Sequence, residues 1–302
     1  MATNETAGVL EAGLEQTFRR RRHPLRSLLK VAWQNPLGLF GFLVIITLVI
    51  VAIFAPLIAP YDVGDFRAGQ PTENPSWSHL FGTDGLGRDL FSRVVFGARI
   101  SLFVAFFSVI GGTVLATIIG IISGYAGGVI DGLIQRAVDT AIAFPILLLL
   151  LILAQVLGPS MQTVIFAVGI AIIAPVARVV RGAVLSERNN QYVEAARALG
   201  ATTPRILFVH IAPNVIALAI IIATTLLGTA ILAEAALSFL GLGIPVPNPS
   251  WGTDLNLSRA EFPIHIWWAI FPGAAITLTV LGFNLLGDSL RDIFDPRLRG
   301  RL

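Results

Sequence analysis

The stretch ERNNQYVEAARALGATTPRILFVHIAPN, residues 187–214, is a polar segment between two long apolar runs. Asn190 or Gln191 suits the start of a short helix that reaches Leu199. Gly200 suits its end, because glycine tolerates the left-handed backbone found where many helices stop. The pattern therefore predicts a short helix with a fixed end.

A second short helix is predicted later in the same stretch. Thr203 is placed as its N-cap and Pro204 as its first residue, where the missing N–H of proline costs nothing. We expect this helix to reach Ile211, and Pro213 to separate it from the next apolar run. A simple loop could join the two apolar runs in a few residues. We therefore expect another molecule to bind the helix–break–helix segment.

The composition of the chain indicates a membrane protein. Of its 302 residues 55% are hydrophobic and 13% are charged, and the mean hydropathy is +0.80. Soluble domains average about 25% charged residues. The chain has no cysteine, which excludes a disulfide framework, a thiolate nucleophile and a cysteine-based metal site.

Several apolar stretches are long enough to cross the hydrocarbon region, which takes roughly 20 residues in a helix. We therefore predict an all-α polytopic membrane protein in which the third and fourth spans form a tight hairpin. The six predicted transmembrane helices cover about 38–59, 100–123, 138–157, 163–184, 214–239 and 266–287.

Small and unusual residues within the spans predict how these helices pack. The second span carries a ribbon of small residues at intervals of four, which lets another helix approach closely. Proline inside a span is tolerated where neighbouring protein or a cavity satisfies the freed carbonyls. Asp139 would begin the third span, where a first-turn acid stabilises the helix dipole. The ribbon is Gly112, Ala116, Gly120 and Gly124, and the prolines are Pro145, Pro175 and Pro272.

The positive charges predict the orientation of the chain. Of the 21 lysine and arginine residues, 16 lie on the side that holds both termini and the 187–213 loop, and five lie on the other. Positive residues are retained on the cytoplasmic side of membranes. We therefore expect both termini and the 187–213 loop to be cytoplasmic, with the run Arg19–Arg22 acting as an orientation signal that contacts anionic lipids.

A turn with charges of both signs precedes the second span. We expect Arg88 to Ala98 to form a helix at the membrane interface, because its apolar residues share one face. The turn is either a salt-bridged support for this helix, or a contact for an extracytoplasmic protein or part of an outer gate. Its residues are Gly82, Thr83, Asp84, Gly87, Arg88 and Asp89.

Patterns that carry enzyme chemistry are missing from the sequence. There is no GxxxxGK[ST] loop that would cradle a nucleotide, and no HExxH zinc motif. The four histidines are scattered over both predicted sides of the membrane. We predict no catalytic residue and no metal site, and we expect the chain not to be an enzyme.

Four blocks of sequence resemble one family. The triplet Glu194-Ala195-Ala196, with Gly200 six residues after the glutamate and Pro213 closing the loop, is similar to the EAA loop of bacterial ABC importer permeases. The blocks FGTDGLGRDLFSRVVFGARISL (81–102), ALSFLGLGIPVPNPSWG (236–252) and GDSLRDIFDPRLRG (287–300) resemble the C-type permease subunit of dipeptide, oligopeptide and nickel importers. The resemblance covers about residues 30–300.

This resemblance implies a type I ABC importer permease fold in a bacterial or archaeal cell membrane. The implied partners are a homologous B-type permease, two ABC ATPase subunits that bind ATP and Mg, and an extracytoplasmic substrate-binding protein. The cargo would be a dipeptide, an oligopeptide, a nickel chelate or another small solute. The residues expected to couple transport to ATP hydrolysis are Tyr192, Glu194, Ala195, Ala196, Leu199, Gly200, Pro204 and Pro213.

The expected segments follow from the spans and the resemblance. They are a cytoplasmic arm (1–35, disordered over 1–18), the first transmembrane helix (36–60), an extracytoplasmic loop with the interfacial helix (61–99), a core permease domain of five transmembrane helices with the 187–213 loop (100–290), and a cytoplasmic tail (291–302).

Three alternatives stay open at this stage. Glu194 could pair with Arg197, contact a partner, or do both. Glu234 lies within the fifth span, where an acid must face protein or water, so it either pairs with an outer arginine (Arg88, Arg93 or Arg99) or lines a gate or substrate path with Pro175 and Asn284. The rival functions are a stand-alone ion- or proton-coupled transporter, which would need intramembrane acid relays and an internal repeat, and a membrane scaffold.

Overall fold

The computed structural model describes residues 35–66 and 68–294. Within these ranges the regular secondary structure is helical, and one isolated β-bridge joins Thr83 to Asp89. The arm up to residue 34 and the end of the tail, including the run Arg19–Arg22, lie outside them. The helices are α3 (Pro36–Ile53), α4 (Ala55–Ile58), α5 (Leu90–Ala126), α6 (Gly128–Ala143), α7 (Ile146–Leu157), α8 (Met161–Arg188), α9 (Gln191–Ala198), α10 (Thr203–Arg205), the π-helix η1 (Ile206–Ile211), α11 (Ala212–Phe239), α12 (Trp251–Ser258) and α13 (Trp267–Phe294).

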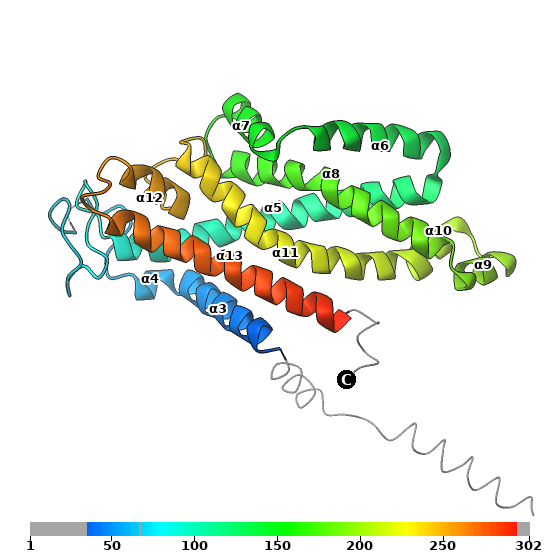
Figure 1. Cartoon of the computed structure of the whole chain (residues 1–302), viewed down its shortest axis with the longest axis horizontal. Coiled ribbons are helices and arrows are strands. Elements are labelled where there is room, and N and C mark those ends of the chain that lie inside the picture. The colour runs from blue at the N-terminus through cyan, green and yellow to red at the C-terminus, as the bar shows by residue number, and fades with distance from the viewer. Residues whose placement is uncertain (1–34, 67, 295–302) are drawn as a thin grey trace, which may run out of the picture.

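The long helices run along one axis of an elongated bundle (Figure 1). Helix α9 lies at one end, which we call the α9 end, and α12 lies at the other, the α12 end. In the described part of the chain, five helices are long and apolar enough to cross a membrane, or six when the bent pair α6–α7 counts as one span. This agrees with the six predicted spans and with an all-α polytopic protein.

The third span differs from its prediction, which was one helix over 138–157. Helix α6 begins at Gly128, and α6 and α7 meet at an angle of 91°. Phe144 has the extended backbone (φ −77°, ψ 131°) that a residue before proline prefers, and Pro145 lacks the N–H needed to continue the helix. Asp139 therefore lies late in α6, and its predicted place in the first turn of a span is wrong.

The predicted interfacial helix is the first part of a longer one. Helix α5 continues without a break for 37 residues, from Leu90 to Ala126, and Gly127 ends it with φ +66°. No proline interrupts this stretch. The apolar residues that predicted a separate interfacial helix therefore belong to the same helix as the span. At 1.5 Å per residue α5 is about 55 Å long, well beyond the ~30 Å hydrocarbon thickness.

The predicted ribbon of small residues is confirmed at the α5–α8 interface. A Cβ atom added at Gly112 would lie 2.5 Å from the carbonyl oxygen of Gly169, and one added at Gly120 would lie 2.6 Å from Val180 Cγ1. Ala116 between them is fully buried. The two backbones therefore approach closely, as small residues allow in membrane helix pairs.

Gly112→Leu is expected to destabilise the bundle, because its side chain would have to displace the α8 backbone. The neighbouring variant Gly111→Leu is the control, since a Cβ at Gly111 meets nothing within 4 Å. Overpacking costs about 1–3 kcal/mol, so the thermal unfolding midpoint in detergent should fall for Gly112→Leu alone. Equal midpoints for the two variants would contradict this packing.

Candidate functional site: the 187–213 loop and the polar cluster at the opposite end

Helix α9 ends as the sequence predicted. Gly200 has φ +82°, the left-handed region that glycine tolerates. Its N–H donates to the Arg197 carbonyl at 3.0 Å, and the Ala201 N–H donates to the Ala196 carbonyl at 3.0 Å. These two bonds form a Schellman motif, which satisfies the last carbonyls of the helix and fixes the direction of the chain that leaves it.

The second half of the loop departs from its prediction. The N-cap is Thr202, without a side-chain capping bond, and Thr203 is the first helical residue, so the predicted Thr203 cap is wrong. Pro204 is therefore the second helical residue rather than the predicted first, and it still lies in the first turn, where proline is tolerated. Thr202 has the extended backbone (φ −70°, ψ 153°) that is typical of an N-cap residue.

Pro213 does not separate the second helix from the fifth span. Residues Thr203–Phe239 form one candidate span through α10, η1 and α11. The Ala212 N–H donates to the Leu207 carbonyl, five residues back, which is the hydrogen bond of a π-turn. Proline lacks the N–H that an α-helix would use, and the π-turn immediately before Pro213 lets the helix pass it.

A polar network ties α9 to its two neighbours. The Tyr192 hydroxyl donates to the Glu187 carboxylate, and Asn190 Nδ2 donates to the same carboxylate at 2.9 Å. Asn214 Nδ2 donates to the Tyr192 oxygen and to the His210 carbonyl, both at 3.2 Å. Partial burial and the bond to Glu187 raise the pKa of Tyr192, so its hydroxyl remains a donor at neutral pH.

The surface of the loop carries two strongly exposed apolar side chains. Leu199 is 89% exposed and Phe208 is 76% exposed, while Val193 is fully buried and anchors α9 to the bundle. Glu194 and Ala195 are exposed and Ala196 is half-buried. Exposed apolar side chains grouped at one end of a molecule are typical of a contact surface for another protein.

The predicted pairing of Glu194 with Arg197 is not seen. Neither residue forms an ion pair with any residue in the ranges 35–66 and 68–294. Both side chains are exposed on α9, so their charges remain available at the surface of the loop.

Ionic contacts hold α6 against α8 near the α9 end. The Arg181 guanidinium donates to both oxygens of Asp131, at 2.6 and 2.5 Å. Arg178 pairs with Asp139. Arg188 Nη1 donates to the Tyr125 carbonyl at 3.0 Å, at the end of α5. Three of the arginines that suggested a cytoplasmic side therefore also join helices to one another.

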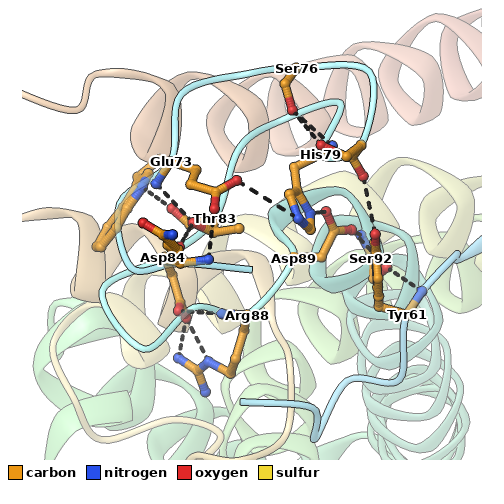
Figure 2. Close-up of polar contacts among 12 residues, drawn as sticks. Tyr61, Glu73, Ser76, His79, Thr83, Asp84, Arg88, Asp89 and Ser92 are labelled. Carbon is orange, nitrogen blue, oxygen red and sulfur yellow. Dashed lines mark hydrogen bonds and ion pairs between the residues drawn. The ribbon is translucent and has the colours of Figure 1, made fainter. Parts of the chain in front are cut away.

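The predicted outer turn is a salt-bridged support (Figure 2). Asp84 accepts hydrogen bonds from the Leu86 and Arg88 backbone N–H groups at 2.8 and 3.0 Å, and pairs with the Arg88 side chain at 2.5 Å. Asp84 and Arg88 are buried. Thr83 Oγ1 accepts a hydrogen bond from the Glu73 N–H at 2.9 Å. The Thr83 backbone carbonyl accepts one from Trp268 Nε1 at 2.8 Å.

Asp89 joins this turn to the bundle as the N-cap of α5. Its carboxylate accepts from the Ser92 N–H at 2.8 Å and lies 2.9 Å from His79 Nδ1 (Figure 2). Gly82 and Gly87 have φ of +78° and +76°, and a Cβ at Gly87 would lie 2.5 Å from the Gly69 carbonyl oxygen. All six residues of the predicted turn are thus structural, while its contact with another protein stays a prediction.

A buried ion pair that the sequence analysis missed joins α5 to α12. Arg93 Nε and Nη2 donate to one oxygen of Asp254, at 2.8 and 2.5 Å, and both side chains are almost fully buried. Beside them Trp251 Nε1 donates to the Val94 carbonyl at 2.9 Å. The two charged residues are 161 positions apart, so no spacing rule could have connected them.

Glu234 has partners other than those predicted. Its carboxylate is fully buried and accepts from Ser101 Oγ at 2.9 Å and from Ser238 Oγ at 2.8 Å. The predicted pairing with Arg88, Arg93 or Arg99 is therefore wrong, because Arg88 and Arg93 bind nearer acids. Pro175 and Asn284 are exposed on α8 and α13, so the structure does not gather the three predicted path residues in one site.

Comparison with known proteins identifies the family. Residues 116–300 match the family described as "Binding-protein-dependent transport system inner membrane component", and residues 24–74 match "N-terminal TM domain of oligopeptide transport permease C". The chain belongs to this family of transport permeases. This agrees with the resemblance found in the sequence and with the helical bundle.

Curated relatives match over most of the chain. The dipeptide transport system permease protein DppC of Alkalihalophilus pseudofirmus is 43% identical over 276 residues, 91% of each chain. The glutathione transport system permease protein GsiD of Escherichia coli O1:K1 is 45% identical over 259 residues, 85% of this chain and 86% of that protein. The chain is thus a multi-pass ABC importer permease that works within a transporter complex, and its relatives are permeases rather than enzymes.

Asp254→Asn is expected to destabilise the protein strongly, because it leaves the buried Arg93 charge without a counter-charge. Breaking one side of a buried pair costs about 3–5 kcal/mol. Asp139→Asn is the control, since that pair is exposed, with side-chain exposures of 46% and 64%, and surface pairs contribute about 0–1 kcal/mol. The thermal unfolding midpoint should fall for Asp254→Asn alone.

Replacing both members, with Arg93→Met and Asp254→Leu together, should recover most of the lost midpoint. If the double variant were as unstable as Asp254→Asn, the loss would come from disturbed packing of α12 rather than from the unpaired charge.

Proposed function

We propose that this chain is the C-type permease of an importer for short peptides, and that the 187–213 loop transmits the work of two partner ATPases. The observation that carries the proposal is α9 itself. It is a short helix with a fixed end, anchored by Val193 and the Tyr192 network, and it presents Leu199 to solvent at the tip of the bundle.

The remaining parts of the complex follow from this role. The α9 end faces the cytoplasm, as the distribution of the 21 positive residues favours. The ATPases bind ATP and Mg there, a homologous B-type permease covers the side of the bundle, and a substrate-binding protein docks at the α12 end. ATP binding moves the docked loops together and tilts the spans, and hydrolysis resets them. The cargo is a short peptide, as the names of the dipeptide and glutathione relatives suggest.

Leu199→Asp is expected to uncouple the transporter, because a charge would occupy the apolar contact with the ATPase. Truncating a central apolar contact costs an interface about 2 kcal/mol or more, so transport by the complete reconstituted complex should fall by at least about tenfold. Val129→Asp is the control, since Val129 is 78% exposed at the start of α6 and lies outside the 187–213 loop. Equal transport by the two variants would contradict docking at α9.

Gly200→Val is expected to misdirect the chain after α9 and to reduce coupling. The cause is backbone strain of about 1–2 kcal/mol in the left-handed region, not bulk, since a Cβ at Gly200 meets nothing within 4 Å. Gly200→Asn is the control, because asparagine tolerates this backbone. Peptide-stimulated ATPase activity should be lost for valine and largely kept for asparagine; loss in both would point to a need for glycine beyond backbone conformation.

A further inference from the structure

A cavity of about 490 Å³ lies on the part of the bundle nearer the α9 end, between α8, α11 and α13. Helix α11 runs between α8 and α13 (Figure 1) and forms its floor, with Ile221, Thr225 and neighbouring residues. Pro175 lines the α8 side. The volume falls in the range of about 300–1,000 Å³ that is typical of small-molecule sites.

The wall of this cavity is mostly apolar, and apart from Thr225 its polar side chains come from α13. Asp288 and Arg291 of α13 line it together, and three positions along a helix place them about one turn, or roughly 4.5 Å, apart on nearly the same face. Neither forms an ion pair with any residue in the described ranges, nor do they pair with each other. The cavity therefore presents one negative and one positive group, both without a partner among these residues.

We propose that this cavity is a transit site for zwitterionic short peptides, a proposal that rests on the importer function above. The peptide ammonium binds the Asp288 carboxylate, and the peptide carboxylate binds the Arg291 guanidinium, whose paired N–H groups match carboxylate geometry. The apolar walls formed by α8 and α11 accept peptide side chains of varied shape with little discrimination between them. A lone cation or anion would need several groups of one charge, which the cavity lacks.

The position of the site gives it a defined step in transport. It lies on the side of Glu234 toward the α9 end, since Leu218–Leu226 precede Glu234 in a helix that runs from the α9 end to the α12 end. Peptide delivered at the α12 end reaches it late, just before release. Losing either charge should therefore lower the maximal transport rate while leaving the concentration of loaded binding protein for half-maximal transport unchanged.

The first test is uptake of alanyl-alanine by the complete transporter in liposomes. Asp288→Asn and Arg291→Gln should each lower the maximal rate by about tenfold, the loss expected for one charge-assisted hydrogen bond. Asp292→Asn is the matched control, since Asp292 is an exposed acid on the same helix that does not line the cavity. The exchange Asp288→Arg with Arg291→Asp restores one charge of each sign and should recover part of the rate.

The second test measures occupancy of the cavity, and because this chain has no cysteine, maleimide on this subunit reports only the introduced residue. Alanyl-alanine should slow maleimide labelling of Ile221→Cys inside the cavity, and should leave Ile220→Cys, an exposed neighbour outside it, unaffected. The protection should disappear in the Asp288→Asn background. Alanyl-alanine amide, which lacks the carboxylate, should protect poorly.

The outcomes separate this inference from the proposed function. If the unmodified complex takes up no dipeptide, the proposed function fails. If it takes up dipeptide but the charge variants behave like Asp292→Asn, or the amide protects Ile221→Cys as well as the dipeptide does, the transit site is wrong and the importer function stands.

Discussion

The close approach of α5 and α8 is the constraint on which the bundle depends. In a membrane there is little hydrophobic drive between helices, so packing of the backbones must supply much of the attraction. Gly112, Gly120 and Gly124 leave room for α8 to lie directly on α5. Once α8 is fixed, its arginines hold α6, and its end carries the 187–213 loop.

The buried acids and the exposed loop lie at opposite ends of the bundle. At the α12 end the acids Asp84, Asp89 and Asp254 are buried and bonded to donors within the chain. At the α9 end the apolar side chains of Leu199 and Phe208 are left exposed. The acids of the α12 end are thus satisfied by contacts within the chain, while apolar side chains at the α9 end are available for contact with another protein.

Local rules explain what could be predicted from the sequence. Hydropathy located the spans, and the preference of glycine for a left-handed turn located the end of α9 at Gly200. The errors arose where a local signal competed with the rest of the fold. Pro213 was predicted to end a helix, but a π-turn lets the helix continue past it. Pro145 was predicted to lie within one continuous span, but the chain bends there by 91°. Partners distant in sequence, such as Arg93 and Asp254, follow no local pattern.

The length of α5 has a mechanical consequence. It is capped by Asp89 beside the polar turn at one end, and its last carbonyls accept from Arg188 at the other. A continuous helix of about 55 Å resists bending and moves as a rigid rod. A tilt of only about 5° about one end would displace the other by roughly 5 Å, close to one helical turn. Such a rod is a lever, which can carry a small rotation at one membrane surface to the other without any change of internal structure.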